Sequence, residues 1–442
     1  MDIKKTYVKI RRYAHNTLWI MSDRFLSLGI GFAVTVILAR YLGPADFGIF
    51  SYATSIVTLF AAAGHMGLSG LVVREIIIKP DERGSTIGAT FGLKLLGMGA
   101  GYIILLCYGL IFEGVDSIEF AAIVIAGATL LFRPFDVLEF WFQAYIQAKY
   151  TAIARVTGVL VGAVLKLLFV FSGLGVLYIV ATNLIQAIAV AMIMLVIYKL
   201  KSDLSFARWC FSWKKAKSLL GEGWQVYLGS IFSLIYLKSD QIMLRWFDGS
   251  EAVGVYAVAA QLSEAWYFIP AAIVASIFPR LIKLREESHL QFNERFQQLL
   301  DILLITGLGA AIAVNIFAEW IVSLFFGSGY AHSADILVIH IWAAVFIFMR
   351  AAFSRWILIE NALAFSLITQ GAGAIINVVL NFVFIPKYGA LGAAYTTLIS
   401  YAFASYFSLF FYRKTRAVFF MMTKSLFTPI RYAKRLSNEE NA

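Results

Sequence analysis

The turn RYLGPADFGIF, Arg40–Phe50, joins two long apolar runs near the start of the chain. It returns in altered form as WFDGSEAVGVY, Trp246–Tyr256, again between apolar runs. In both copies a glycine begins the turn, a second glycine follows five residues later, and an aromatic residue comes two positions after that. The same offset of 206 positions (249 minus 43) brings Arg74 onto Arg280. These matches in one register predict that the chain contains two copies of one unit.

Composition places the chain in a membrane. Of its 442 residues, 61% are hydrophobic and only 14% are charged, whereas soluble domains carry about 25% charged residues. Apolar runs of roughly 20 residues, long enough to cross a hydrocarbon core of about 30 Å, recur along almost the whole length. We therefore predict an all-α polytopic membrane protein.

The apolar runs predict about twelve transmembrane helices. They cover residues 16–40, 45–68, 85–112, 118–145, 152–171, 175–198, 218–246, 251–278, 297–326, 334–353, 362–385 and 391–412. An even number of helices in each copy gives both copies the same orientation, so the repeat is parallel. The predicted domains are an N-terminal six-helix bundle (1–198), a basic linker (199–217), a C-terminal six-helix bundle (218–412) and a basic tail (413–442).

Lysine and arginine predict the orientation. The net charge of +11 comes from bases in alternate connecting segments, whereas the opposite segments hold little beyond Arg40, Arg245 and Lys387. By the positive-inside rule, both termini and the linker are cytoplasmic. The basic start, residues 1–12, lacks a following short apolar region and cleavage site, so we expect no cleaved signal peptide. Aromatic residues alternate with bases in the linker, which favours an interfacial element on anionic lipid over a site for a partner.

The fourth predicted helix carries a polar stripe. Its members fall at helical spacing on one face, with an arginine one turn before them and a proline beside it: Arg133, Pro134, Asp136, Glu139, Gln143 and Gln147. Each costs several kcal/mol if it faces lipid, so the stripe is expected to face the bundle interior. Two interpretations remain open, a substrate cavity and an internal pair of Arg133 with Asp136 that only holds helices together. Pro134 also permits a local break in the helix.

Other polar residues inside the predicted helices are further candidates for the interior. They are Asp23 and Arg24 in the first helix, Lys94 in the third, Lys166 in the fifth, Asp240 in the seventh, Glu264 in the eighth, and Asn377 with Asn381 in the eleventh. For Lys94 and Lys166, lining a cavity and snorkelling to the interface are about equally expected. The two asparagines either line the cavity or bridge helices.

No pattern in the sequence indicates an enzyme. There is no phosphate-binding glycine loop followed by Lys-Ser or Lys-Thr, and the five histidines lack the paired spacing of metal ligands. His65 and His340 remain candidate proton carriers. We therefore expect neither a catalytic residue nor a metal or other cofactor.

Short segments along nearly the whole chain resemble one transporter family. They are Leu42-Gly43-Pro44, Phe47-Gly48, Val73-Arg74-Glu75, Glu139–Gln143 leading to Lys149-Tyr150, Ser239–Leu244, Phe268-Ile269-Pro270, Phe278-Pro279-Arg280, and Asn377–Ala394 with Ile385-Pro386-Lys387-Tyr388-Gly389. In combination they resemble the Wzx-type polysaccharide and O-antigen flippases of the multidrug/oligosaccharidyl-lipid/polysaccharide exporter superfamily. The sequence departs from the family pattern at His65, Ala144 and Ile146.

The resemblance implies a MATE-like fold that moves a polyprenyl-diphosphate-linked oligosaccharide from the cytoplasmic to the outer leaflet of the cell membrane by alternating access. Its partners would be the lipid-linked glycan, membrane lipids and other membrane proteins of polysaccharide assembly, with no nucleic acid. Cations suit a diphosphate and polar side chains suit sugars, so the predicted substrate residues are Arg24, Lys94, Arg133, Glu139, Gln143, Lys166 and Asn377. The candidates for ion coupling are Asp23, Asp136, Asp240 and Glu264.

Two other functions remain open. A small-molecule exporter of the same fold would share the topology, but its cavity should be acidic and aromatic, to suit cationic drugs. A membrane glycan polymerase or ligase would be expected to carry a large outward loop, and the predicted outward loops are all short.

Overall fold

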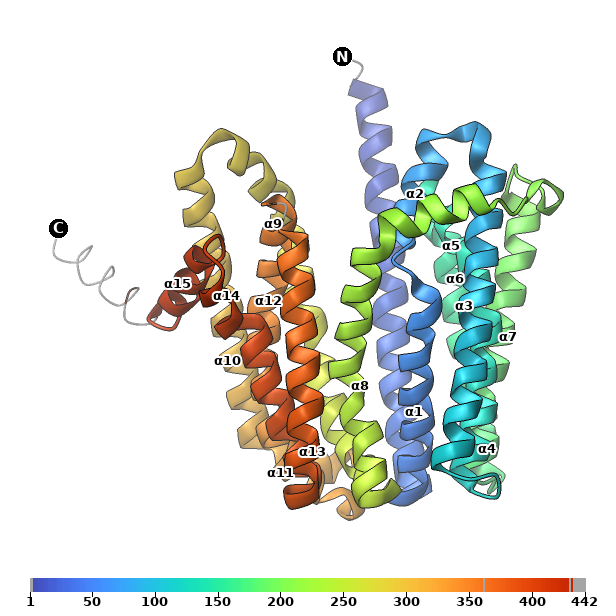
Figure 1. Cartoon of the computed structure of the whole chain (residues 1–442), viewed down its shortest axis with the longest axis vertical. Helices are drawn as coiled ribbons and strands as arrows, with labels where there is room; N and C mark the ends of the chain where they lie inside the picture. Colours follow the sequence, from blue (N-terminus) through green and yellow to red (C-terminus); the bar gives the residue numbers. More distant parts are fainter. Residues whose placement is uncertain (1–2, 361, 429–430, 432–442) are drawn as a thin grey trace. The chain divides into compact units, whose positions relative to one another are not determined.

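The computed structural model of the chain describes residues 3–360, 362–428 and 431, and these are helical with no β-strand. The first half contains α1 (Ile3–His65), α2 (Ser69–Ile78), η1 (Pro80–Glu82), α3 (Arg83–Phe112), α4 (Ile118–Gly127), η2 (Ala128–Asp136), α5 (Val137–Ala144), α6 (Ala148–Phe171), α7 (Val176–Lys201), η3 (Phe206–Arg208) and α8 (Trp213–Glu264) (Figure 1). The second contains η4 (Ala265–Tyr267), α9 (Phe268–Glu287), α10 (His289–Phe326), η5 (Ser328–Tyr330), α11 (His332–His340), α12 (Trp342–Ile359), α13 (Leu363–Ala402), the π-helical η6 (Phe403–Phe407), α14 (Ser408–Phe411) and α15 (Arg416–Ser425).

Three of the long helices are broken at a glycine with positive φ. The breaks lie at Gly43 in α1 (φ 69°, ψ 175°), Gly249 in α8 (φ 84°, ψ −178°) and Gly389 in α13 (φ 55°, ψ −135°). Only glycine adopts such angles without strain. The described residues contain nine helices long and apolar enough to cross a membrane, and the three breaks divide these into twelve, as predicted. The nearly equal angles at Gly43 and Gly249 also support the predicted internal repeat.

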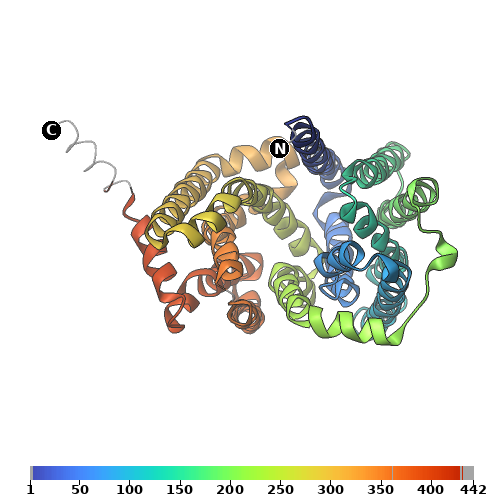
Figure 2. The same ribbon diagram turned by 90° about the horizontal axis from the view of Figure 1, so that it is seen from above.

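The chain forms two compact units, Met1–Leu234 and Ile235–Ala442, with the boundary inside α8. Seen end-on, the helices of unit 1 stand side by side as a bundle, and so do those of unit 2 (Figure 2). In unit 2, Asp248, His332 and Tyr388 line one surface hollow, whereas Arg285 near the end of α9 binds Glu360, which directly follows α12. Successive connections of unit 2 therefore alternate between two ends of its bundle.

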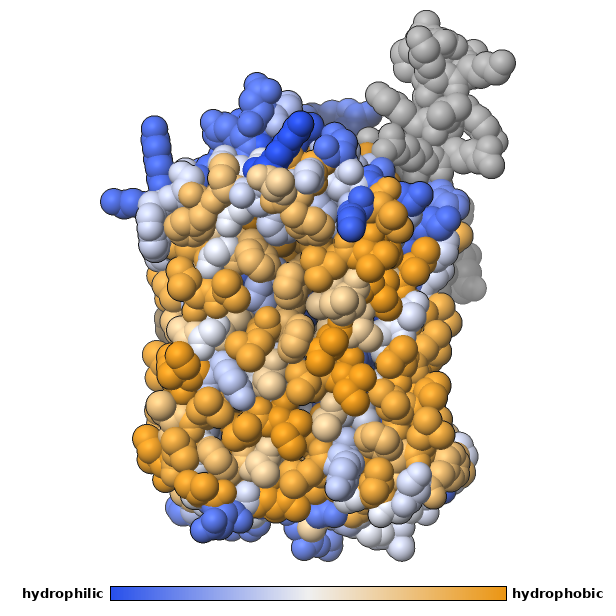
Figure 3. Space-filling model, turned by 90° about the vertical axis from the view of Figure 1, so that its right-hand side faces the viewer, coloured by the Kyte–Doolittle hydropathy of each residue, from blue (hydrophilic) through white to orange (hydrophobic). Residues whose placement is uncertain are grey.

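Unit 1 alternates in the same way. At one end Asn16 Oδ1 accepts a hydrogen bond from the backbone N–H of Ala148 (2.7 Å), and at the other the Tyr41 hydroxyl donates to the carbonyl of Leu174 (3.1 Å). The first of these ends also holds α2, η1 and the linker, so we call it the basic end. Figure 3 shows an apolar belt between two hydrophilic edges on one face of the molecule, as expected for a chain that spans a membrane.

An aromatic cluster at the basic end fixes α5 against the rest of unit 1. The Trp141 ring lies edge-on to the Tyr198 ring of α7, with 5.7 Å between centroids, and both side chains are buried. Trp209 of the linker lies against the same tyrosine and donates its indole N–H to the Tyr198 hydroxyl (3.1 Å). Buried aromatic side chains each remove 150–250 Å² from solvent, so this cluster holds α5, and the polar residues it carries, in one orientation.

Ion pairs hold the linker end of α8 against α2 and η1, and we call this group of ion pairs the clasp. Lys215 Nζ lies 2.5 Å from Glu75 Oε2 and 2.6 Å from Glu82 Oε2, and Arg74 binds Glu222 at 2.6 Å. The side chains of Lys215 and Glu75 are only 11% and 8% exposed, so this pair is shielded from solvent. The Lys215 ammonium beside Glu75 lowers the pKa of that carboxyl below its usual value of 4.5.

Because the folded protein lowers the pKa of Glu75, the clasp is expected to stabilise unit 1 above about pH 4.5 and to lose that contribution as pH falls through the folded pKa. At pH 7, Glu75→Gln should cost about 2 kcal/mol, because it removes a charge-assisted bond from a nearly buried lysine. Hydrogen exchange of residues 202–216 in detergent would rise in the variant at pH 7, and the difference from wild type would shrink as the pH is lowered below about 4.5. A difference that did not change with pH below 4.5 would contradict this account.

A second buried network lies at the other end of unit 1. The Tyr52 side chain is fully buried, and its hydroxyl donates to Glu113 Oε1 (2.7 Å) and lies 2.9 Å from the Tyr108 hydroxyl. Tyr52→Phe is expected to destabilise the protein by about 2 kcal/mol, the typical value of a hydrogen bond to a charged group. Unfolding in SDS would measure the loss. Tyr178→Phe is the control, since Tyr178 is 57% exposed and its loss should be neutral.

Candidate functional site

The fourth predicted span is interrupted at its centre. After α4 the chain tightens into the 3-10 helix η2, which contains Pro134, and then continues as α5. This confirms the local break expected from the proline. A 3-10 helix has three residues per turn, so Arg133 and Asp136 lie one above the other on the same face. The break thus presents two opposite charges to the interior of unit 1 in the middle of an apolar span.

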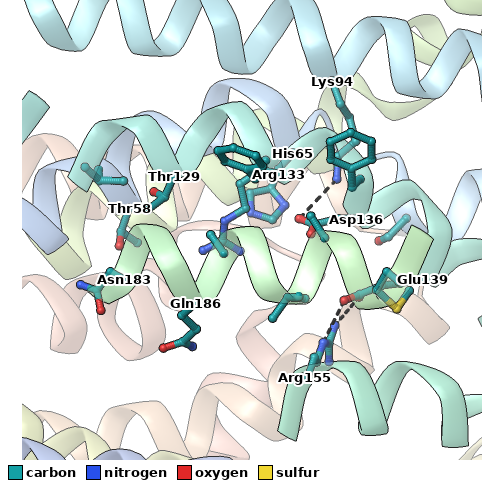
Figure 4. Close-up of a pocket in the computed structure, with 18 of the residues that line it drawn as sticks. Thr58, His65, Lys94, Thr129, Arg133, Asp136, Glu139, Arg155, Asn183 and Gln186 are labelled. Atoms are coloured by element: carbon teal, nitrogen blue, oxygen red, sulfur yellow. Dashed lines mark hydrogen bonds and ion pairs between the residues drawn. The ribbon is translucent and has the colours of Figure 1, made fainter. Parts of the chain in front are cut away.

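These residues line a cavity of about 820 Å³ inside unit 1. Its walls come from α1, the start of α2, α3, α4, η2, α5, α6, α7 and the first part of α8. Charged side chains and neutral hydrogen-bonding side chains share the lining (Figure 4). The charged ones are Lys94, Arg133, Asp136, Glu139 and Arg155, and the neutral ones include Thr58, Thr129, Gln143, Asn183 and Gln186. A volume of this size is typical of a ligand site.

Lys94 is committed to an ion pair. Its Nζ lies 3.7 Å from Asp136 Oδ2 and 5.2 Å from the centre of the Phe140 ring, and its side chain is only 2% exposed. The pair and the ring together satisfy a lysine that would otherwise be isolated in the interior. Lys94 therefore lines the cavity and does not snorkel, and Asp136 pairs with Lys94 in place of Arg133.

Arg155 is committed as well. Its Nε donates to Glu139 Oε1 (2.9 Å) and its Nη2 donates to the other oxygen of the same carboxylate, which makes a bidentate pair (Figure 4). Its Nη1 also lies 3.5 Å from Asp23 Oδ2. One arginine thus ties α6 to α5 and α1. Two acids share this guanidinium, so it has little capacity left for a ligand.

Arg133 differs from both. Among the residues that the structure describes, it forms no hydrogen bond or ion pair, and its side chain is exposed to the cavity beside His65 (Figure 4). A guanidinium that is exposed to the cavity at mid-span and forms no ion pair keeps its fork of donors available, and an anion in the cavity can bind to it. Arg133 is therefore the cation that the structure leaves available to an anionic ligand.

The remaining predicted site residues are dispersed. Arg24 is exposed on α1 and does not line the cavity, and Lys166 is buried elsewhere in unit 1 with no hydrogen bond or ion pair in the described part of the chain. Gln147 lies beyond the end of α5, outside the cavity lining. Asn377 is fully buried in unit 2, so it does not join the cavity of unit 1.

Sequence reasoning missed Arg155 as a site residue. It lies three residues after the start of the predicted span 152–171 and six after Lys149, where a base is expected at the membrane interface. In the structure it lies two turns inside α6, and that depth within an apolar run was the available signal. Asn183 and Gln186 of α7 were also missed, although two amides within one turn of an apolar helix are the same kind of signal.

A second polar cluster is enclosed within unit 2. The Asp240 carboxylate is 2% exposed and accepts hydrogen bonds from the Tyr256 hydroxyl (2.7 Å), Asn381 Nδ2 (2.6 Å) and the Thr397 hydroxyl. Asn377 Oδ1 accepts from Ser239 and Asn381, at 2.6 and 3.2 Å. No lysine or arginine in the described residues forms an ion pair with Asp240. Glu264, by contrast, lies 3.6 Å from Lys238 Nζ.

The two asparagines of α13 thus bridge helices, the second of the roles open to them. Whether Asn377 also contacts a ligand stays a prediction. The described residues contain no group of three or more His, Cys, Asp or Glu side chains that could hold a metal ion.

Comparison with known proteins places this site in context. The family described as "Polysaccharide biosynthesis protein" matches residues 13–285. The chain is 25% identical over 394 residues to the "Putative O-antigen transporter" of Shigella flexneri, with 86% of this chain and 92% of the relative covered. It is 22% identical over 396 residues to the "Probable low-salt glycan biosynthesis flippase Agl15" of Haloferax volcanii, with 88% and 81% covered.

Solved structures with the same architecture are transporters. The TM-score is 0.71 with "Lipid II flippase MurJ, inward closed conformation", at 14% identity over 93% of this chain and 91% of that one. It is 0.67 with "Inward-facing conformation of a multidrug resistance MATE family transporter of the MOP superfamily", at 16% identity over 90% and 96%. These similarities confirm the predicted MATE-like fold and, at such low identity, speak for the fold alone.

Proposed function

The chain belongs to the polysaccharide biosynthesis protein family, and on that premise we propose that it is a flippase for a polyprenyl-diphosphate-linked oligosaccharide. The glycan would be a repeat unit of a polysaccharide or O-antigen, carried from the cytoplasmic to the outer leaflet of the cell membrane. The resemblance to Wzx-type flippases agrees with the family match and with the names of the relatives. No bond is made or broken in such transport, so the protein would act as a transporter without a catalytic residue.

The observation that carries this proposal is the unpaired Arg133 in the cavity of unit 1. Lys94 and Arg155 are each held by a carboxylate, which leaves one guanidinium for a substrate anion. A guanidinium binds phosphate oxygens through two parallel N–H donors, so it suits a diphosphate better than a point charge does. The drug-exporter alternative would be expected to leave a carboxylate unpaired there, and both Asp136 and Glu139 are paired.

The neutral lining suits the sugar. Asn183, Gln186 and Gln143 offer amide donors and acceptors, and Thr58 and Thr129 offer hydroxyls. Sugar hydroxyls exchange hydrogen bonds with such groups at little cost in desolvation. In this proposal the diphosphate lies at Arg133 and the glycan extends along α7. The pairs of Lys94 with Asp136 and of Glu139 with Arg155 hold the side chains around Arg133 in place.

Asp240 is the coupling residue we favour among the four acidic candidates. Asp23, Asp136 and Glu264 each lie near a basic side chain, whereas the donors that the buried Asp240 finds among the described residues are all neutral. A buried carboxylate without a counter-charge costs several kcal/mol, and that cost is removed when a proton or a sodium ion joins it. Binding of a proton or a sodium ion at Asp240 would therefore lower the free energy of the conformation in which this cluster is enclosed.

The predicted orientation of the protein in the membrane allows the membrane potential to favour export of the anionic lipid headgroup. With the basic end of unit 1 in the cytoplasm, both termini are cytoplasmic, as the positive-inside rule predicts. Moving the anionic headgroup outward is then favoured by an inside-negative potential, by about 2.3 kcal/mol per charge for each 100 mV. Alternating access would come from movement of the bundles 1–198 and 218–412 about the linker.

Leaflet reorientation of a fluorescent polyprenyl-diphosphate oligosaccharide in proteoliposomes tests the proposal. Protein-dependent reorientation of that lipid, without efflux of an organic cation such as ethidium, is the expected result. Efflux of the cation with no reorientation of any lipid-linked glycan would replace the flippase with a small-molecule exporter.

A further inference from the structure

An apolar cleft of about 460 Å³ lies at the basic end of unit 1, between α3 and the linker. We call it the α3–linker cleft. One wall is a helical face of α3, with residues spaced three or four apart, and the other wall is aromatic. The lining residues are Gly88, Phe91, Gly92, Leu95 and Leu96 of α3, and Trp209, Phe211 and Trp213.

The cleft is built by close approach of the linker to α3. A Cβ atom at Gly88 would lie 2.4 Å from the carbonyl oxygen of Cys210, and one at Gly92 would lie 2.5 Å from the Phe211 ring. The backbone N–H of Cys210 also donates to the carbonyl of Gly84 (3.3 Å). The glycines therefore allow the linker to lie directly on the helix and hold the aromatic wall in a fixed position.

The cleft remains open on its far side. Leu95 and Leu96 are 47% and 57% exposed, and Phe211 and Trp213 are 44% and 67% exposed. α3 continues from here as a membrane-spanning helix with exposed apolar residues such as Ile103, so the cleft is continuous with the lipid-facing surface. Exposed aromatic side chains at the end of a span are typical of the level of the lipid headgroups.

Basic side chains without a partner among the described residues lie next in sequence to the aromatic residues of the cleft. Arg208, Lys214 and Lys217 are exposed, and within the described part of the chain none of them forms a hydrogen bond or an ion pair through its side chain. Lys217 lies one turn after Trp213 on the same face of α8. Lys215, between them, is already taken up by the clasp to Glu75 and Glu82. Apolar walls with unpaired bases at one end complement a molecule that has an acyl chain and an anionic head.

We propose that the α3–linker cleft binds one anionic phospholipid of the surrounding leaflet. One acyl chain lies between the face of α3 and the aromatic wall, and the phosphate lies against Lys214 and Lys217. A zwitterionic lipid would gain the same apolar contact but much less from the bases. This site is separate from the cavity of unit 1 and does not depend on the proposed transport function, only on the chain spanning a membrane.

Native mass spectrometry of the whole protein in detergent tests this site. The probes are dioleoylphosphatidylglycerol and dioleoylphosphatidylcholine, which have the same acyl chains. We expect one saturable phosphatidylglycerol site that binds the choline lipid at least ten-fold more weakly. Lys214→Gln with Lys217→Gln should weaken it roughly 30-fold, since each base near an anionic headgroup contributes about a five-fold factor.

Two further variants keep the test decisive. Trp213→Ala removes part of the aromatic wall from an exposed position and should weaken both lipids by the same factor. Arg413→Gln with Lys414→Gln removes two exposed bases in unit 2 and should leave the site unchanged. Equal binding of the two lipids, or equal loss in both charge variants, would show only the general attraction of annular lipid and would overturn the proposal. Hydrogen exchange of the linker checks that each variant is folded. A variant that keeps the Lys215–Glu75 ion pair should show the same exchange in the linker as wild type.

Discussion

Arg133→Ala is expected to slow reorientation of a polyprenyl-diphosphate-linked glycan about 100-fold in proteoliposomes. A bidentate, charge-assisted contact to phosphate contributes about 3 kcal/mol, and each 1.4 kcal/mol is a factor of ten. No other cation of the cavity can take over, because Lys94 is held by Asp136 and Arg155 by Glu139. The fold should survive, since Arg133 has no partner in the described part of the chain whose charge its loss would expose.

Matched variants separate phosphate binding from a general effect of charge. Arg133→Lys keeps the charge but loses the fork of donors, so it should recover only part of the rate. A monophosphate-linked glycan should show a smaller difference between wild type and Arg133→Ala than the diphosphate does. Arg155→Ala should instead lower the thermal stability, because it leaves Glu139 and Asp23 without a cation. If Arg133→Ala reoriented the lipid at the wild-type rate, the diphosphate would not bind at Arg133 and this part of the proposal would be wrong.

The fold was largely predictable because it depends on signals with a short range. Apolar runs locate spans wherever each run is bounded by polar residues. The turn at Gly43 and its copy at Gly249 were recognisable because the backbone there needs positive φ, which restricts the sequence. The exact helix ends were less predictable. The helix α1 begins at Ile3 and α8 at Trp213, each ahead of the apolar run from which the span was predicted.

The site was less predictable because pairing depends on tertiary packing. Of the stripe on the fourth span, Arg133, Asp136, Glu139 and Gln143 line the cavity and Gln147 does not. Their roles in binding and coupling stay predictions. Which charges pair with one another depends on how α3 and α6 pack against that span. The spacing of residues within one helix does not predict this packing. The same limit applies to Asp240, whose hydrogen-bond partners come from residues up to 157 positions away.

Asp240→Asn is expected to abolish the response of transport to an imposed ion gradient while leaving the protein folded. In wild-type proteoliposomes, reorientation should accelerate when a proton or sodium gradient is applied, because the ion removes the uncompensated charge of a buried carboxylate. An asparagine carries no charge in any state, so its rate should be the same with and without the gradient. Applying each gradient separately identifies which ion is used.

The surrounding hydrogen bonds permit this substitution. The Tyr256 and Thr397 hydroxyls can still donate to an amide oxygen. If Asn381 turns its amide over, its oxygen accepts from the new NH₂ group, and its own NH₂ group donates to the Thr396 hydroxyl, which can donate to the carbonyl of Ala393. We expect a loss of about 1 kcal/mol for Asp240→Asn. For Asp240→Ala the expected loss is about 3 kcal/mol, because three buried donors then lose their acceptor. SDS unfolding of both variants distinguishes these values.

Glu264→Gln is the matched control for coupling. It also removes a carboxylate from unit 2, but that carboxylate lies 3.6 Å from Lys238 and its side chain is 32% exposed, so its charge is compensated whether or not an ion is bound. The gradient response should therefore persist in Glu264→Gln. If the response were instead lost in Glu264→Gln and kept in Asp240→Asn, the compensated pair would be the coupling element and burial without a counter-charge would be the wrong criterion. If both variants kept it, the membrane potential acting on the anionic headgroup would be sufficient to drive export.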